Sequence, residues 1–378
     1  MGGTDELLDR IRGEISQSGP ISFARFMELA LYDPHDGYYA RGPRRLGPDG
    51  DFVTASDAGR AFGRCMARQL SEIDRRLGPL DPFDVVEFGS GRGLLARDVL
   101  DAMAELDARL AGRLRYRLVD RSPAMRAESG RTVPEAESLD PRALAGGYRG
   151  CLLAVELFDA LPVHRLRRRR GRLTELRVGV GDGGRFVEVE AKPTPEARSL
   201  AERYGAAGEE GTEAEVAPSA LSQLETMART LERGVIIVVD YGDRAAELYG
   251  PSRPHGTLVA YHRHSTRQDL LAQVGEQDLT AHVNFSALED HAAELGLAVL
   301  GLTTQDRFLI ANGILDEFES GDLAEARDPR NVKRRLQAMR LIHPESMGRR
   351  FKVLAFSKGC ESLPELDGLK DPFSRSVT

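Results

Sequence analysis

The chain has 378 residues, 41% hydrophobic and 29% charged, which is typical of a soluble protein of two or three domains or of one elaborated α/β domain. Its formal net charge of −7 argues against a basic surface for nucleic acid or anionic lipid, and no apolar run approaches the length of a membrane span. We therefore expect neither a nucleic-acid partner nor a membrane partner. The three cysteines are far apart and form no CxxC motif, so we expect a cytoplasmic protein without disulfides or a metal site.

The N-terminal part of the chain is predicted to be mainly helical. Apolar residues recur at helical spacing over residues 4–17, and a second helix is expected after Pro20 with Ser22 as its N-cap. Residues 32–52 are rich in proline, glycine and aspartate, which indicates a long loop. A further helix is predicted over residues 57–77.

From residue 83 onward, short apolar runs alternate with helical patterns. Strands are predicted at 83–88, 116–120, 151–155 and 235–240, with a helix over 94–106 and another beginning at Ser122-Pro123. Such alternation predicts an α/β fold with a mainly parallel sheet and helices on both faces.

An insertion separates the third and fourth of these strands. It contains a predicted hairpin (174–178 and 186–190) and a helix over 218–231. The arginine-rich run 165–172 is either a solvated edge strand or a docking surface for an acidic protein. Later elements are expected at 286–295 (helix), 297–303 (strand), up to about 341 (helical) and 351–356 (strand).

A glycine-rich turn follows the first of the core strands, with glycines at positions 89, 91 and 93. Glycines allow a tight turn and close approach to a ligand, and the free N–H groups of the following helix favour an anionic group. A dinucleotide site would need another glycine where Leu94 stands. Glu87 before the turn and Asp120 after the next strand favour S-adenosylmethionine (SAM), while a nucleotide site or a plain tight turn remain alternatives.

Several segments along the chain carry a resemblance to a known family. They include GDFVTASDAGRAFGR (50–64), VVEFGSGRGLLARDVL (85–100), VELFDALPVHRL (155–166), VIIVVDYG (235–242) and GEQDLTAHVNF (275–285). In combination and order they resemble the MidA-like family of class I SAM-dependent methyltransferases. Mitochondrial members of that family are protein-arginine methyltransferases that support assembly of respiratory complex I.

The resemblance implies a Rossmann-like, mainly parallel seven-stranded sheet with N-terminal helices and inserted hairpin and helical segments. It implies SAM as cofactor, with the methionine end wrapped by Glu87, Gly89, Ser90, Gly91 and Gly93, the ribose held by Asp120, and a covering loop that contains Phe52 and Thr54. The family usually has Asn at position 155 and commonly Asp at position 284, where this chain has Val155 and Asn284.

These inferences divide the chain into five expected parts. Residues 1–80 would form an N-terminal helical region with the cofactor-covering loop, and residues 81–162 and 234–358 the two halves of the core, the second with a helical insertion. Residues 163–233 would form the hairpin-and-helix insertion, and 359–378 a flexible tail.

An arginine acceptor is a planar cation that needs carboxylates for bidentate binding. Glu156 and Asp159 are spaced i, i+3, so a helical turn after the third core strand would place both on one face at the sheet's carboxyl edge. Alternatively, one caps the helix and the other meets an arginine. Asp240, at the end of the next strand, is either a site residue or fastens a loop. His282 could deprotonate a neutral acceptor or be structural.

Three functions therefore remain open at this point. The first is methyl transfer to a protein arginine, which the whole-chain resemblance favours. The second is methyl transfer to a small molecule. The third is a SAM-binding assembly or interaction factor without turnover.

Overall fold

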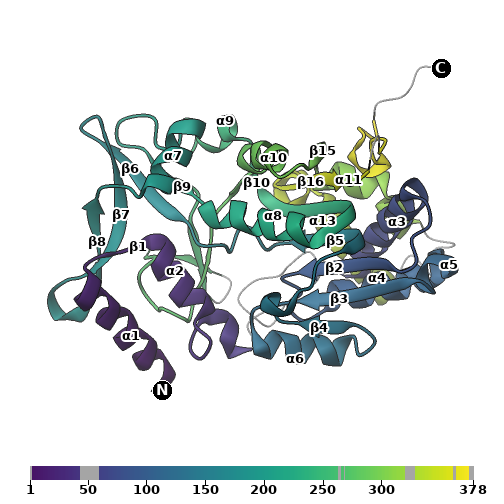
Figure 1. Ribbon diagram of the computed structural model, residues 1–378, viewed down its shortest axis with the longest axis horizontal. Coiled ribbons are helices and arrows are strands. Elements are labelled where there is room, and N and C mark those ends of the chain that lie inside the picture. The colour runs from purple at the N-terminus through teal and green to yellow at the C-terminus, as the bar shows by residue number, and fades with distance from the viewer. Residues whose placement is uncertain are drawn as a thin grey trace.

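The computed structural model describes residues 2–42, 59–262, 265–267, 269–319, 328–360 and 363–373. Two parts lie side by side in Figure 1, a core built on one large sheet and a second part that contains the N-terminal helices. Among the described residues, no helix is both long and apolar enough to cross a membrane.

The core sheet has the strand order β15-β16-β10-β5-β2-β3-β4, with the short β14 added beside the end of β10. Every neighbouring pair along this order is parallel except the two pairs that contain β16. This confirms the predicted mainly parallel sheet of seven strands. The bounds of these seven strands and of β14 are β2 (Phe83–Phe88), β3 (Leu114–Val119), β4 (Glu137–Leu139), β5 (Tyr148–Val155), β10 (Leu231–Asp243), β14 (Val283–Asn284), β15 (Ala298–Thr304) and β16 (Phe351–Lys358).

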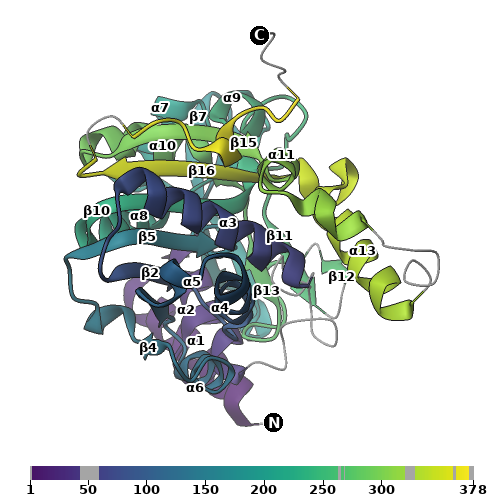
Figure 2. The ribbon, with the colours of Figure 1, turned by 90° about the vertical axis from the view of Figure 1, so that its right-hand side faces the viewer.

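Helices cover both faces of this sheet, which explains its continuous apolar strands. Val85 of β2 packs toward α3 and α4, and its neighbour Val86 packs toward α8 and α10 on the opposite face. Figure 2 shows α3 and α4 over the face that is turned to the viewer. The core helices are α3 (Arg60–Leu77), α4 (Leu94–Leu106), α5 (Ala108–Ala111), α6 (Pro123–Thr132), α8 (Pro218–Thr230), α9 (Ala245–Leu248), α10 (Phe285–Glu294), α11 (Gln305–Ala311) and α13 (Pro329–Ile342).

The second part of the molecule combines segments that are distant in sequence. Helix α2 begins at Phe23, and its predicted cap is confirmed because Ser22 Oγ accepts the N–H of Arg25 at 3.1 Å. The elements are α1 (Gly2–Ser18), β1 (Ile21–Ser22), α2 (Phe23–Tyr32), β6 (His164–Arg169), β7 (Arg172–Val180), β8 (Phe186–Ala191), α7 (Pro195–Tyr204), β9 (Glu213–Val216), β11 (Val259–His262), β12 (Ser265–Arg267) and β13 (Asp278–Thr280).

One hydrophobic core joins these segments and corrects the expected boundaries. Phe26 of α2, Val178 of β7 and Leu279 of β13 belong to the same buried cluster. Helix α3 instead packs into the main core, where Phe62 is buried. Residues 1–80 are therefore not one region, because their apolar faces are buried against two different parts of the molecule.

The arginine-rich strand β6 was expected at an edge or as a basic docking surface, and the first expectation is wrong. Strand β6 lies between β7 and β9. Arg167 pairs with Glu213 at 2.6 Å and Arg169 with Glu190 at 3.0 Å, whereas Arg168 donates to the carbonyl of Ala207 at 3.0 Å. These acidic partners neutralise part of the run, and the docking surface for an acidic protein stays a prediction.

The described part of the C-terminal tail is packed rather than flexible. Leu366 is 1% exposed and belongs to the main core together with residues of α3 and α11. The backbone N–H of Asp367 donates to Glu72 Oε1 at 2.9 Å. The tail prediction was wrong for residues 366–369, because two apolar side chains spaced three residues apart, Leu366 and Leu369, are buried in the core.

Truncation of Leu366 tests this anchoring. We expect Leu366→Ala to lower the free energy of unfolding by about 2–5 kcal/mol, as for other buried leucines. Phe373→Ala is the matched control, because Phe373 is 67% exposed and its loss leaves no cavity. Urea unfolding of both variants measures the difference, and equal stabilities would contradict the packed tail.

Candidate active site

A large cavity opens at the carboxyl ends of β2, β3 and β5, where the strand order reverses between β2 and β5. Its empty space is about 1310 Å³, including the open mouth. Both parts of the molecule contribute to its walls, since Tyr32 and Tyr39 come from the N-terminal part and the remaining lining residues from the core. The position and size of the cavity fit a nucleoside-sized ligand.

The glycine turn forms the floor of this cavity, as the sequence predicted. Gly89, Gly91 and Gly93 all have positive φ angles, of 71°, 49° and 75°. A Cβ atom on Gly89 would lie 2.9 Å from Leu157 Cδ1 and would be strained by the left-handed backbone, so glycine is favoured there. Gly93 precedes the first residue of α4, which directs the start of that helix toward the cavity.

Two carboxylates frame the turn. Glu87 at the end of β2 accepts the hydroxyl of Tyr116 at 2.7 Å. Asp120, directly after β3, accepts the N–H groups of Gly91 at 3.0 Å and Ser122 at 2.8 Å. Asp120 therefore fixes the turn itself, and each of its oxygens keeps a further acceptor position for a ligand hydroxyl.

Burial changes the acidity of both carboxyl groups. Desolvation raises the pKa of Glu87 to about 7 and that of Asp120 to about 6. Both groups line the cavity, so a cationic ligand there would favour their ionised forms.

The cavity also contains an unpaired polar atom. Ser90 Oγ is buried and has no hydrogen-bond partner among the described residues. A buried hydroxyl without a partner is costly, and a polar ligand in the cavity would satisfy it. The donor and acceptor set of Glu87, Ser90 and Asp120 thus fits a cofactor with an amino-acid part and a ribose. The other two predicted cofactor residues, Phe52 and Thr54, lie outside the described residues.

The turn after β5 differs from the predicted helical turn. Glu156 has a left-handed φ of 52°, and residues 156–161 form bends and turns. The N–H groups of Leu157, Phe158 and Asp159 all donate to one oxygen of Asp240, at 3.1, 2.8 and 3.3 Å. Asp240 is fully buried, so it fastens this turn and is not a cavity residue. The chain folds around a carboxylate that is supplied by the neighbouring strand.

The expected shared face of Glu156 and Asp159 is therefore wrong. Glu156 lines the cavity, whereas Asp159 is buried outside it and bonds the hydroxyl of Tyr241. Desolvation raises the pKa of Asp159 to about 6, and its Oδ1 has no hydrogen-bond partner among the described residues. Only Glu156 of the two faces the place where a ligand would bind.

His282 is also placed away from the cofactor cavity. It lines a separate small cavity, and its ring packs edge-on against Tyr241 with centroids 5.3 Å apart. Burial lowers its pKa to about 4, so it is neutral near pH 7. Asn284 caps α10 by accepting the N–H of Ala287 at 3.1 Å. Since Asn and Asp cap helices equally well, this departure from the family pattern has a structural explanation.

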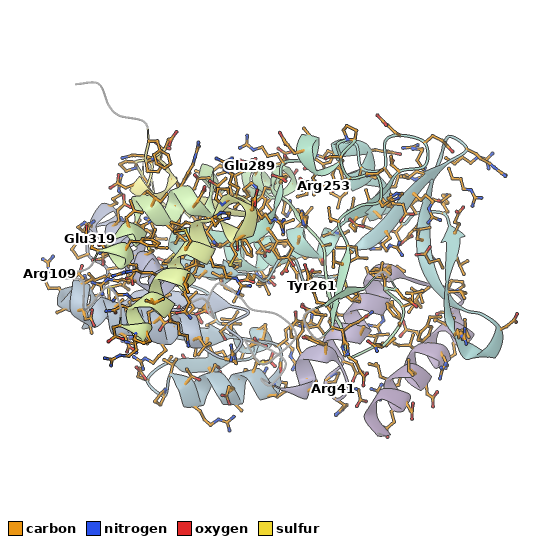
Figure 3. The ribbon with its side chains drawn as sticks, turned by 180° about the vertical axis from the view of Figure 1, so that it is seen from behind. Arg41, Arg109, Arg253, Tyr261, Glu289 and Glu319 are labelled. Atoms are coloured by element: carbon orange, nitrogen blue, oxygen red, sulfur yellow. The ribbon has the colours of Figure 1, made fainter. Side chains whose placement is uncertain are left out.

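Sequence reasoning assigned no role to Tyr32, Tyr39 and Arg121, which join the two parts of the molecule at the cavity. The guanidinium of Arg121 lies 4.3 Å from the centre of the Tyr32 ring and pairs with Glu28. Tyr39 donates to Asp278 at 3.0 Å. The closely spaced tyrosines of the segment YDPHDGYYA are the sequence feature that could have indicated this role. In Figure 3, Arg41 and Tyr261 mark the boundary between the two parts.

The sheet order, the glycine turn and the carboxylates at the ends of β2 and β3 define a class I methyltransferase fold with its cofactor cavity. A family model described as "Putative S-adenosyl-L-methionine-dependent methyltransferase" matches residues 65–303, and the chain belongs to this family. It is a SAM-dependent methyltransferase.

Individual relatives support the same assignment. The mitochondrial protein arginine methyltransferase NDUFAF7 homolog of Drosophila melanogaster is 29% identical over 94% of this chain and 86% of its own length. NDUFAF7 of Homo sapiens is 28% identical over 92% of this chain and 82% of its own. A crystal structure of a Burkholderia thailandensis protein bound to S-adenosyl-homocysteine is 32% identical and matches with a TM-score of 0.88, over 97% of this chain and 95% of that chain. The MidA-like resemblance is confirmed.

Replacement of Asp240 tests its hold on the turn. We expect Asp240→Asn to speed amide exchange of Leu157, Phe158 and Asp159 by roughly 10–100-fold, because an amide cannot accept all the N–H groups that meet the carboxylate. Hydrogen exchange followed by mass spectrometry of the peptide that contains these residues measures this.

Asp243→Asn is the matched control, since Asp243 ends the same strand but pairs with Arg253 at 2.7 Å. In the Asp243→Asn variant, the amides of residues 157–159 should exchange at the wild-type rate. Unchanged protection in Asp240→Asn would show that the turn holds without the carboxylate.

The raised pKa values predict how cofactor binding depends on pH. SAM carries a positive sulfur and a positive amino group, so it binds best when Glu87 and Asp120 are ionised. Its affinity should rise as the pH increases through about 6 and 7 and level off above. Calorimetry between pH 5.5 and 8 measures this, and Glu87→Gln should flatten the upper part of the curve. An affinity independent of pH would contradict the proximity of these groups to the charged ligand.

Proposed function

We propose that this methyltransferase transfers the methyl group of SAM to an arginine side chain of a protein. The observation that carries the proposal is Glu156, a carboxylate that a left-handed turn holds in the wall of the cofactor cavity. The relatives from Drosophila melanogaster and Homo sapiens are named protein arginine methyltransferases, which supports the same acceptor.

The glycine turn and the two carboxylates beside it provide the residues that we assign to the cofactor. We assign the methionine end of SAM to Glu87, Ser90 and the backbone of the glycine turn, and the ribose hydroxyls to Asp120. Gly89 and Gly91 line the cavity, where the absence of side chains allows a ligand to approach the backbone closely, and Asp120 would serve both the turn and the ligand. When bound, SAM supplies a methyl group on a positively charged sulfur, and the sulfur keeps the electron pair of the C–S bond.

Glu156 would act on the acceptor. Its carboxylate can bind a guanidinium through parallel N–H···O bonds, which orients one nitrogen toward the methyl group. As that nitrogen forms its new bond to carbon it loses a proton, and Glu156 is the carboxylate of the turn that can receive it. Because the strand β10 fixes the turn through Asp240, the position of Glu156 is set before the acceptor arrives.

Tritium transfer tests both the acceptor class and Glu156. The protein is incubated with SAM labelled in its methyl group and a lysate from cells that lack the gene, and labelled proteins are hydrolysed to amino acids. We expect label in methylarginine. Glu156→Gln should lower the transfer by roughly 10–100-fold, the effect of losing a charge-assisted hydrogen bond, with the affinity for S-adenosyl-homocysteine almost unchanged.

Glu289→Gln is the matched control. Glu289 lies on helix α10, pairs with Arg244 and does not line the cofactor cavity. It should transfer label at the wild-type rate. Label confined to small molecules would replace the proposal with a small-molecule methyltransferase. Cofactor binding without any transfer would favour an assembly or interaction factor.

A further inference from the structure

The cofactor cavity continues from the glycine turn along helix α8. Between β4 and β5 the chain forms a single short helical turn, Pro141–Ala143, before it enters β5. As a result, one side of α8 reaches the cavity, through Gln223 and Thr226. The cavity that Gln223 and Thr226 line also contains apolar side chains, among them Phe88, Val119, Pro141 and Leu161.

This apolar lining suits a flat aromatic base, and the polar groups around it determine which base. The hydroxyl of Thr226 is already used, since it donates to the carbonyl of Ser222 at 3.0 Å. Asp140, the carboxylate that follows β4, pairs with Arg142 at 2.9 Å and with Arg126 at 3.3 Å, and it does not line the cavity.

Gln223 is different from these groups. Its side chain lines the cavity, and its Nε2 atom is buried with no hydrogen-bond partner among the described residues. An amide nitrogen that is buried without a partner costs free energy unless a ligand accepts its N–H groups. The two ends of the amide are a donor and an acceptor side by side, and rotation about the last side-chain bond exchanges them.

We propose that Gln223 recognises the adenine base of the cofactor through its side-chain amide. Adenine presents an N–H donor on its exocyclic nitrogen next to a ring-nitrogen acceptor, the pattern that a glutamine amide pairs with bidentately. The apolar side chains of the lining would cover the faces of the ring. The inference rests on the cofactor site proposed above and adds to it the residue that selects the base.

A ligand-by-variant comparison tests this inference by binding alone. Calorimetry gives the dissociation constants of S-adenosyl-homocysteine and of its analogue in which hydrogen replaces the exocyclic amino group. Wild type should bind the complete ligand about tenfold more tightly, because the analogue leaves the amide oxygen without a donor. Gln223→Leu should bind S-adenosyl-homocysteine about tenfold more weakly than wild type and should bind the two ligands equally.

Two further variants keep the test decisive. Glu225→Ala changes an exposed position on the same helix and should keep both the affinity and the discrimination of wild type. Gln223→Asn withdraws the amide by one methylene while retaining its polarity, so it should also lose the discrimination, and it replaces the leucine variant if that variant unfolds.

The outcomes separate this inference from the cofactor site. Undiminished discrimination in both Gln223 variants would overturn the role of Gln223 while leaving the cofactor site intact. A wild-type protein that binds neither ligand would overturn the cofactor site and the inference with it.

Discussion

One buried carboxylate organises the catalytic edge of this molecule. Asp240 ends the apolar part of β10 and accepts N–H groups from three successive residues of the turn after β5, and its other oxygen accepts the N–H of Tyr241 at 2.9 Å. Burial and the neighbouring carboxylates Asp159 and Glu156 raise the pKa of Asp240 well above its ordinary value, and the N–H groups that it accepts oppose this rise. The left-handed conformation of Glu156 follows from this arrangement, since the chain must reverse to bring the three N–H groups to one atom.

The second part of the molecule completes the cavity that this edge begins. Tyr32 and Tyr39 form one wall, and Arg121 crosses from the end of β3 to stack on Tyr32 and pair with Glu28. Ser122 adds a hydrogen bond to the carbonyl of Tyr39 at 2.9 Å. Helix α2 and the segment after it are therefore part of the cavity wall, and the hairpin insertion supports them through the shared hydrophobic core.

Elements whose structure depends only on neighbouring residues could be predicted from the sequence. Strand 83–88, the glycine turn and helix 94–106 lie where they were predicted, because strand pattern, glycine conformation and helix periodicity act within a few residues. The turn at Glu156 could not be predicted in this way, since Asp240 is far along the chain. Pairing of β6 on both sides and the packed tail at Leu366 likewise depend on partners that are distant in sequence.

The central claim is that Asp240 acts on methyl transfer through Glu156, and a double-mutant cycle on the transfer rate tests it most directly. Rates of label transfer to protein are measured for wild type, Glu156→Gln, Asp240→Asn and the double variant, each at saturating SAM. We predict that the double variant is no slower than the slower single variant, because a displaced turn has already lost the use of Glu156. Rate losses that multiply would show that the two carboxylates act independently and would contradict this account.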